Sequence, residues 1–150
     1  MVAAAAVYLN SLQNGFMPDD EVVILYNQWV RDAGGLGKLF SRQYFEASGE
    51  RTYRPAATLL LYIGCRLWGP KAVGYHALSV LLHAASCGLL YVLLLRLFTS
   101  AAEPGAARAA FWASLLFAVH PVNTEAVDAI GYQEDVLALT AMLLAWVLLL

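Results

Sequence analysis

The run from Val73 to Leu95 contains no Asp, Glu, Lys or Arg. An uncharged apolar stretch of more than about 18 residues is typical of a helix that spans a membrane. The composition agrees, because 61% of the residues are hydrophobic and only 13% are charged, against about 45–50% and about 25% in soluble globular domains. The sequence therefore predicts an integral membrane protein. Its net charge of −2 gives no basic footprint for nucleic acid.

Shorter apolar segments on both sides of this run predict further spans. We expect a partial span at residues 1–12, spans at 73–98 and 106–120, and a second partial span at 136–150. Twelve helical residues rise only about 18 Å, whereas a hydrocarbon core is about 30 Å thick. We therefore interpret the chain as a piece of a longer membrane protein. A short interfacial helix is the alternative for its start.

The polar stretch 13–72 is predicted to lie outside the membrane. Within it, Glu21 to Val30 alternates apolar and polar residues at helical spacing, which predicts a short amphipathic helix at the interface. Pro55 to Cys65 is apolar over only 11 residues, and runs of 10–14 are more often interfacial than spanning. If this run does not cross, the 13–54 and 120–135 loops lie on the same side of the membrane. If it crosses, they lie on opposite sides and cannot share a site.

Three adjacent acids, Asp19, Asp20 and Glu21, follow the first apolar segment. Carboxylates at a membrane surface can act as a general base or as metal ligands. The structural alternative is that Asp19 or Asp20 caps a helix after Pro18, with the other acids favoured by the helix dipole. Local sequence leaves both interpretations open.

A second polar group, His120 with Glu125, follows the 106–120 segment, and three more acids come by residue 135. Ionisable groups so close to a bilayer are costly unless they line water or a site. They therefore predict a cluster that faces the first one across a membrane-surface cavity. The structural alternative is a helix cap at Asn123 or Thr124.

Arg54 stands at the start of the 55–65 apolar segment, in the run Thr52-Tyr-Arg54-Pro55. Its planar guanidinium could clamp a phosphate. The structural alternative is an arginine that only anchors the helix to lipid headgroups.

The 73–98 segment carries a polar stripe at spacings of 3, 4 and 3 residues, which places its members on one helix face. We expect these side chains to hydrogen-bond to neighbouring helices rather than to bind metal. The stripe consists of His76, Ser79, His83 and Ser86.

Four segments in fixed order carry a family pattern: NSLQNGFMPDDEVVILYN, TYRPAATLLLY, LWGPKAVGYHALSVLLHAA, and ASLLFAVHPVNTEAV with DVLAL after it. Together they resemble the amino-terminal region of the transmembrane and tetratricopeptide-repeat proteins. These are polytopic members of the GT-C glycosyltransferase fold, related to the protein O-mannosyltransferases. The resemblance runs from about Tyr8 to Leu150. It implies an all-α, GT-C-like membrane helix bundle, with external amphipathic helices between the first two spans.

The resemblance implies that the whole protein transfers a sugar, with mannose expected, from a polyprenyl-phosphate donor to a protein hydroxyl. Asp19 or Asp20 would be the general base and Arg54 would steady the phosphate, while His120 and Glu125 would position acceptor or sugar. The implied partners are the lipid-linked sugar, an acceptor protein and the membrane, without nucleic acid. A divalent cation is the one candidate cofactor, and no residue is assigned as a metal ligand.

The chain departs from the family pattern at three positions. The family usually has a second His at Asn123, an Asn at Ser79 and an Arg at Gln133. Two other functions stay open, a non-catalytic membrane anchor of a repeat scaffold and a transporter fragment in which the polar stripe lines a path. We expect the bacterial cytoplasmic membrane as the location, or the endoplasmic reticulum membrane in a eukaryote. The sugar, the acceptor and the choice between Asp19 and Asp20 stay open.

Overall fold

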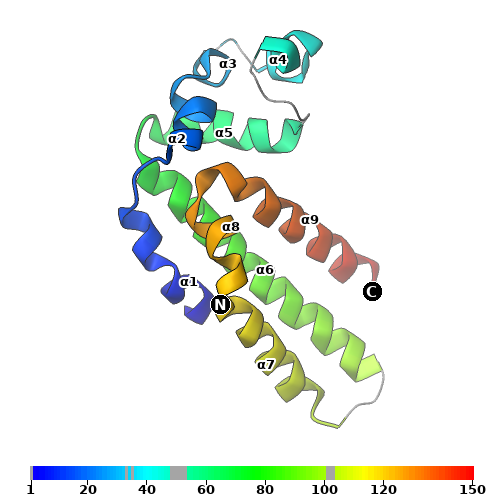
Figure 1. Cartoon of the computed structure of the whole chain (residues 1–150). Coiled ribbons are helices and arrows are strands. Elements are labelled where there is room, and N and C mark those ends of the chain that lie inside the picture. The colour runs from blue at the N-terminus through cyan, green and yellow to red at the C-terminus, as the bar shows by residue number, and fades with distance from the viewer. Residues whose placement is uncertain (1, 33, 35, 48–53, 101–103) are drawn as a thin grey trace.

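The computed structural model describes residues 2–32, 34, 36–47, 54–100 and 104–150, and every regular element in these ranges is a helix (Figure 1). The all-α expectation is therefore confirmed for this part of the chain. The elements are α1 (Val2–Val7), η1 (Leu9–Gln13), α2 (Pro18–Asp20), η2 (Glu21–Leu25), α3 (Gln28–Arg31), η3 (Lys38–Phe40), α4 (Arg42–Ala47), α5 (Pro55–Trp68), α6 (Ala72–Ser100), α7 (Ala106–Val119), η4 (Pro121–Asn123), α8 (Thr124–Asp128), η5 (Ile130–Tyr132) and α9 (Gln133–Leu149).

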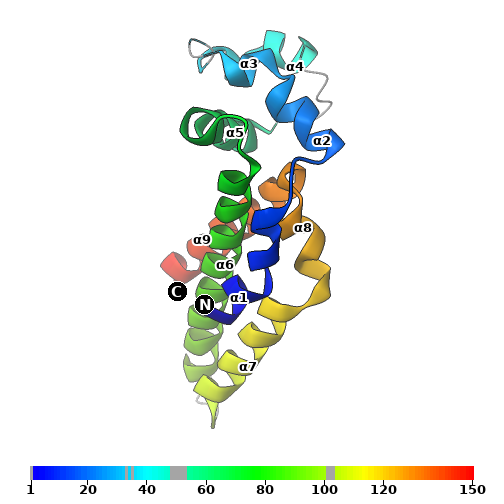
Figure 2. The same ribbon diagram turned by 90° about the vertical axis from the view of Figure 1, so that its left-hand side faces the viewer.

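The long helix α6 is the centre of the fold, and α1, α7 and α9 pack against it (Figures 1 and 2). Its 29 residues correspond to about 43 Å, which exceeds the hydrocarbon thickness of a bilayer. Within the described ranges, two helical stretches are long and apolar enough to cross a membrane, Ala72–Ser100 and Ile130–Leu149. The apolar helix α7 has 14 residues.

The polar stripe of α6 is buried and is used for packing. Each of its four side chains hydrogen-bonds to another segment, as polar groups inside helix bundles generally do. The structural interpretation of the stripe is therefore confirmed. The contacts are His76 Nε2 with the Gly15 carbonyl (3.4 Å), Ser79 Oγ with Gln133 Nε2 (2.9 Å), His83 Nε2 with the Ala118 carbonyl (3.1 Å) and Ser86 Oγ with Thr140 Oγ1 (2.8 Å).

Helix α5 runs crosswise to α6 in both views rather than alongside it (Figures 1 and 2). The chain changes direction at Gly69, whose φ of 57° favours glycine. The packing of the Trp68 ring then fixes the turn between α5 and α6. This ring lies so close to Gly74 that a Cβ on Gly74 would come within 2.2 Å of the indole. On the other side of α5, Ile63 and Leu67 remain exposed, one helical turn apart.

The segment Glu21–Val30 differs from its prediction as a single amphipathic helix. The helix breaks after Leu25, and a new one, α3, begins at Gln28. Asn27 causes the restart, because its Oδ1 accepts hydrogen bonds from the amides of Trp29 (3.0 Å) and Val30 (3.3 Å). An asparagine in this position is a strong helix N-cap, and the prediction of one continuous helix is wrong.

Candidate functional site

Asp20 joins the two polar loops that the sequence singles out. Its carboxylate is buried and accepts two backbone hydrogen bonds, one from the Met17 amide (2.9 Å) and one from the Gly131 amide (2.6 Å). A Cβ on Gly131 would lie 3.2 Å from Asp20 Oδ1, so glycine permits this close approach. The loops after η1 and after α8 therefore meet at one end of α6.

The acids do not cap the helix in the way that the sequence predicts. Neither Asp19 nor Asp20 occupies the N-cap of α2, which is Met17, and Pro18 follows as the first helical residue. Asp20 is the third residue of the helix and reaches back to the Met17 amide, as the acid of a capping box does. Asp20 is therefore a structural residue whatever else it does.

Asp19, the neighbour of Asp20 in α2, is exposed. Among the described residues, no partner forms a hydrogen bond or an ion pair with its carboxylate. A carboxylate in this state can accept a proton from a bound hydroxyl group. The structure thus distinguishes two adjacent acids that look equivalent in the sequence.

Arg54 reaches the same region from the start of α5. Its Nη1 forms an ion pair with Glu134 in the first turn of α9, and the two side chains are 48% and 20% exposed. Residues 52 and 53 of the Thr-Tyr-Arg-Pro run lie outside the described residues. Gly131, just before α9, hydrogen-bonds to Asp20, and Glu134, in the first turn of α9, forms an ion pair with Arg54. Asp20 and Arg54 therefore both contact the region where α9 begins.

His120, just before η4, and Glu125, in the first turn of α8, are both exposed. His120 Nδ1 accepts the Val122 amide (3.1 Å) and so caps η4, which leaves Nε2–H of a neutral ring as a donor. Asn123 instead donates to the Phe117 carbonyl (2.6 Å). The local cap is therefore made by His120, not by the side chain of Asn123 or Thr124. No hydrogen bond links either His120 or Glu125 to Asp20 or Arg54 among the described residues.

Residues 128–134 take a part in this arrangement that their sequence does not reveal. Gln133 is buried and donates from Nε2 to the Tyr75 carbonyl (3.0 Å) and to Ser79 Oγ (2.9 Å). The resemblance stated from the sequence singles out both Gln133 and Ser79, and the structure shows that these two residues are in contact.

Asp128 carries a carboxyl group that has a raised pKa. Burial raises the pKa above its ordinary value, and the positive charge available on His76 partly opposes this. Its Oδ1 has no hydrogen-bond partner among the described residues, which agrees with a carboxyl group that favours its neutral form.

The described residues contain no cluster of side chains that would suit a divalent cation. Within the described ranges, no three His, Cys, Asp or Glu side chains converge as metal ligands would. No catalytic step is therefore assigned to a metal.

These features define a class: a protein whose described elements are all helices, some of them of membrane length, with polar loops that meet at one end of the central helix. Comparison with known proteins then shows which proteins the chain is similar to. The chain is 32% identical over 147 residues to the mouse protein O-mannosyl-transferase TMTC3, and 31% identical over 148 residues to Tmtc1 of Drosophila melanogaster. It is 33% identical over 151 residues to human TMTC1. Over 95% or more of its length, the chain is therefore similar to these TMTC protein O-mannosyl-transferases.

The match covers 95% of the chain for the mouse and fly proteins and 96% for the human one. The chain spans only 15% of the length of the mouse relative and 16% of the other two. No family model and no solved structure matches the chain.

Proposed function

We propose that this chain is part of a membrane glycosyltransferase of the GT-C type, which moves mannose from a polyprenyl phosphate to a hydroxyl group of an acceptor protein. The names of the relatives, protein O-mannosyl-transferases, support the reaction class. The observation that carries the proposal is the Asp20–Gly131 hydrogen bond. It brings together the two loops that hold the candidate acids, which a shared membrane-surface site requires.

In this proposal α5 lies on the membrane surface and does not cross it. Its crosswise course, its 14 residues and its exposed apolar side chains Ile63 and Leu67 suit a helix lying in the interface. Residues 13–72 then form the external region between the first two spans. Both polar loops face the same compartment, in the bacterial cytoplasmic membrane or the endoplasmic reticulum membrane.

Asp19 is the proposed general base, and Asp20 is a positioning residue. The Asp19 carboxylate accepts the proton of the acceptor hydroxyl while that oxygen bonds to the anomeric carbon of the sugar. The bond from that carbon to the phosphate oxygen breaks, and the polyprenyl phosphate leaves with the electron pair. Both oxygens of Asp20 already accept backbone amides, so this residue holds the loop instead.

Arg54 is proposed to stabilise the charge that develops on the leaving phosphate. Its pairing with Glu134 orients the guanidinium, and its exposure leaves it accessible to a ligand. His120 and Glu125 are proposed to hydrogen-bond the sugar or the acceptor. The transporter alternative has less support, because the polar side chains of the stripe on α6 are buried and hydrogen-bond to neighbouring helices.

The test is sugar transfer by the full-length protein carrying Asp19→Asn. Loss of a general base lowers the rate by about 10²–10⁴-fold, so we expect kcat to fall in that range with an unchanged melting temperature. Asp32→Asn is the matched control, because Asp32 is an exposed acid elsewhere in the same external region. Unchanged transfer by Asp19→Asn would remove the base assignment and favour the non-catalytic anchor.

A further inference from the structure

A cavity of about 490 Å³ opens where the carboxyl-terminal end of α5 turns into α6. One wall comes from η2 and α3 and the other from α5 and the turn that follows it. Its lining includes Leu25, Tyr26, Arg31, Cys65, Arg66 and Gly69. Two arginines that are far apart in the sequence, Arg31 and Arg66, therefore line one cavity.

Both arginines are held in place by contacts that leave them positively charged. Arg66 donates to the Val30 carbonyl (3.1 Å) and lies 4.6 Å from the centroid of the Tyr62 ring. Arg31 donates to the Leu25 carbonyl (3.1 Å). Each hydrogen bond uses one of the five N–H donors of its guanidinium, so donors remain for a ligand.

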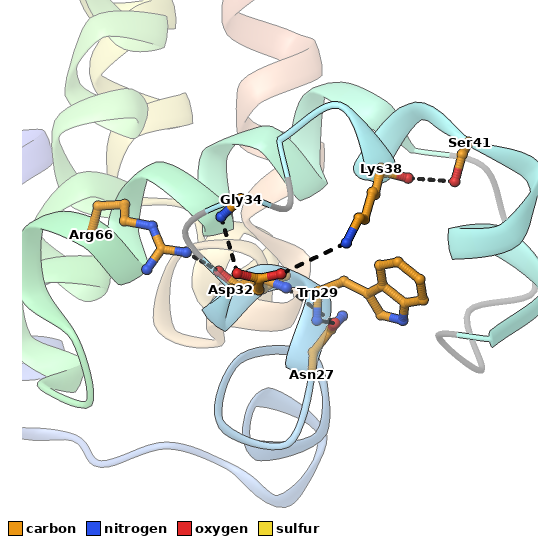
Figure 3. A network of polar contacts seen from close by, with 8 residues as sticks. Asn27, Trp29, Asp32, Gly34, Lys38, Ser41 and Arg66 are labelled. Carbon is orange, nitrogen blue, oxygen red and sulfur yellow. Dashed lines mark hydrogen bonds and ion pairs between the residues drawn. The ribbon is translucent and has the colours of Figure 1, made fainter.

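No described carboxylate neutralises this pair of cations. Asp32 is next to Arg31 in the chain, but its carboxylate binds the Gly34 amide (3.0 Å) and Lys38 (3.9 Å) instead (Figure 3). Neither Arg31 nor Arg66 forms an ion pair within the part of the chain that the structure describes. Two uncompensated guanidinium groups at one cavity favour an anionic ligand.

The depth of the cavity in a bilayer follows from the proposed function, in which α6 spans the membrane. Helix α6 begins at Ala72, and its length of about 43 Å matches a bilayer with its headgroups, about 40–45 Å, rather than the hydrocarbon core alone. Gly69 and Pro70, which line the cavity, therefore belong to the headgroup layer. Trp68 at the same corner suits that layer, in which aromatic side chains are enriched.

We infer that this cavity binds the phosphate group of an anionic membrane phospholipid, with Arg31 and Arg66 as its ligands. Planar guanidinium groups match the geometry of phosphate oxygens. The exposed Leu67 beside Arg66 offers an apolar surface to the adjoining acyl chains. The site is separate from Arg54, which lies twelve residues before Arg66 and therefore about 18 Å away along α5.

The test is lipid binding by the full chain in detergent, measured by native mass spectrometry with added phosphatidylglycerol. We expect Arg31→Gln with Arg66→Gln to weaken binding by about tenfold or more, since each cation near a membrane surface contributes on the order of a factor of five. The matched control is Arg42→Gln with Arg108→Gln, which removes two exposed arginines outside the cavity and should leave binding unchanged. Equal losses in both double variants would overturn the proposal.

A second double variant keeps the test valid if the variant with Arg31→Gln and Arg66→Gln folds poorly. Arg31→Lys with Arg66→Lys retains both charges but loses the planar fork, and we expect binding between that of the wild type and the glutamine variant. Unchanged binding in both cavity variants would overturn the site.

Competing ligands identify the source of the phosphate. We expect inorganic phosphate at millimolar concentration to leave phosphatidylglycerol bound. Displacement by inorganic phosphate would overturn the lipid assignment in favour of a free anion. If a short polyprenyl phosphate binds through Arg31 and Arg66 more tightly than phosphatidylglycerol does, the cavity is a donor site and the assignment to bulk phospholipid is wrong.

Discussion

Gln133 donates a hydrogen bond of 2.9 Å to Ser79, joining the first turn of α9 to the buried face of α6. Both side chains are buried. Because both are uncharged, no buried cation needs a partner at this contact.

A double-mutant cycle should detect this contact. We expect Ser79→Ala and Gln133→Ala to be coupled by about 0.5–1.5 kcal/mol, because each single change removes the same hydrogen bond. The measurement is the free energy of unfolding of the four proteins in detergent. Ser114→Ala is the control, since Ser114 Oγ is buried without a described partner, and its removal should cost little. Strictly additive effects of Ser79→Ala and Gln133→Ala would contradict the coupling.

Replacing Asp20 should lower the free energy of unfolding, whereas replacing its neighbour Asp19 should hardly change it. Asp20→Asn places an amide where both carboxylate oxygens accept backbone N–H groups, and we expect a loss of about 1–3 kcal/mol in the free energy of unfolding. Asp19→Asn, at an exposed position, should change stability by less than about 0.5 kcal/mol. Equal effects of the two changes would show that the buried tether does not hold in solution.

Asp128 should make stability depend on pH. Its pKa is raised in the folded chain, so the folded state binds its proton more tightly than the unfolded state. Stability is therefore greatest below the ordinary pKa of an aspartate, and it falls as the pH rises through the raised value. We expect Asp128→Asn to have a higher melting temperature than the wild type at neutral pH, with the difference shrinking toward pH 3. A variant that is less stable at every pH would contradict this.

The Arg54–Glu134 pair should matter more for the reaction than for stability. Partly exposed ion pairs contribute about 0–1 kcal/mol, so Arg54→Lys should barely change the melting temperature. If Arg54 binds the donor phosphate, the loss of its planar fork should raise KM for the donor or lower kcat. Glu134→Gln should give a smaller change in the same direction, because it removes only the partner that orients Arg54. Steady-state transfer assays of the full-length protein measure both, and a large stability loss with normal kinetics would argue for a purely structural pair.

Features set by local sequence were predictable, and those set by distant contacts were not. The uncharged run at Val73–Leu95 and the stripe from His76 to Ser86 are properties of one helix. The structure has there a helix long and apolar enough to cross a membrane, and the stripe is buried. Asn27 was overlooked because its flanking residues continue an amphipathic pattern, although its capping ability breaks the helix.

The contacts that organise the candidate site cross most of the chain. Asp20 and Gly131 are 111 positions apart, and Arg54 and Glu134 are 80 positions apart. Gly131 contributes only a backbone amide, so no side-chain pattern marks it. Proximity of the two acidic loops could be proposed from topology, whereas the distinct environments of Asp19 and Asp20 required coordinates.

The single carboxylate of Asp20 has a kinetic consequence for any substrate that enters this end of the molecule. Since it fastens one loop to the other, neither loop can swing outward alone while both bonds persist. A bulky acceptor that displaces one loop would have to displace the other loop at the same time. Exchange of the Gly131 amide hydrogen with solvent would then report the frequency of that joint opening.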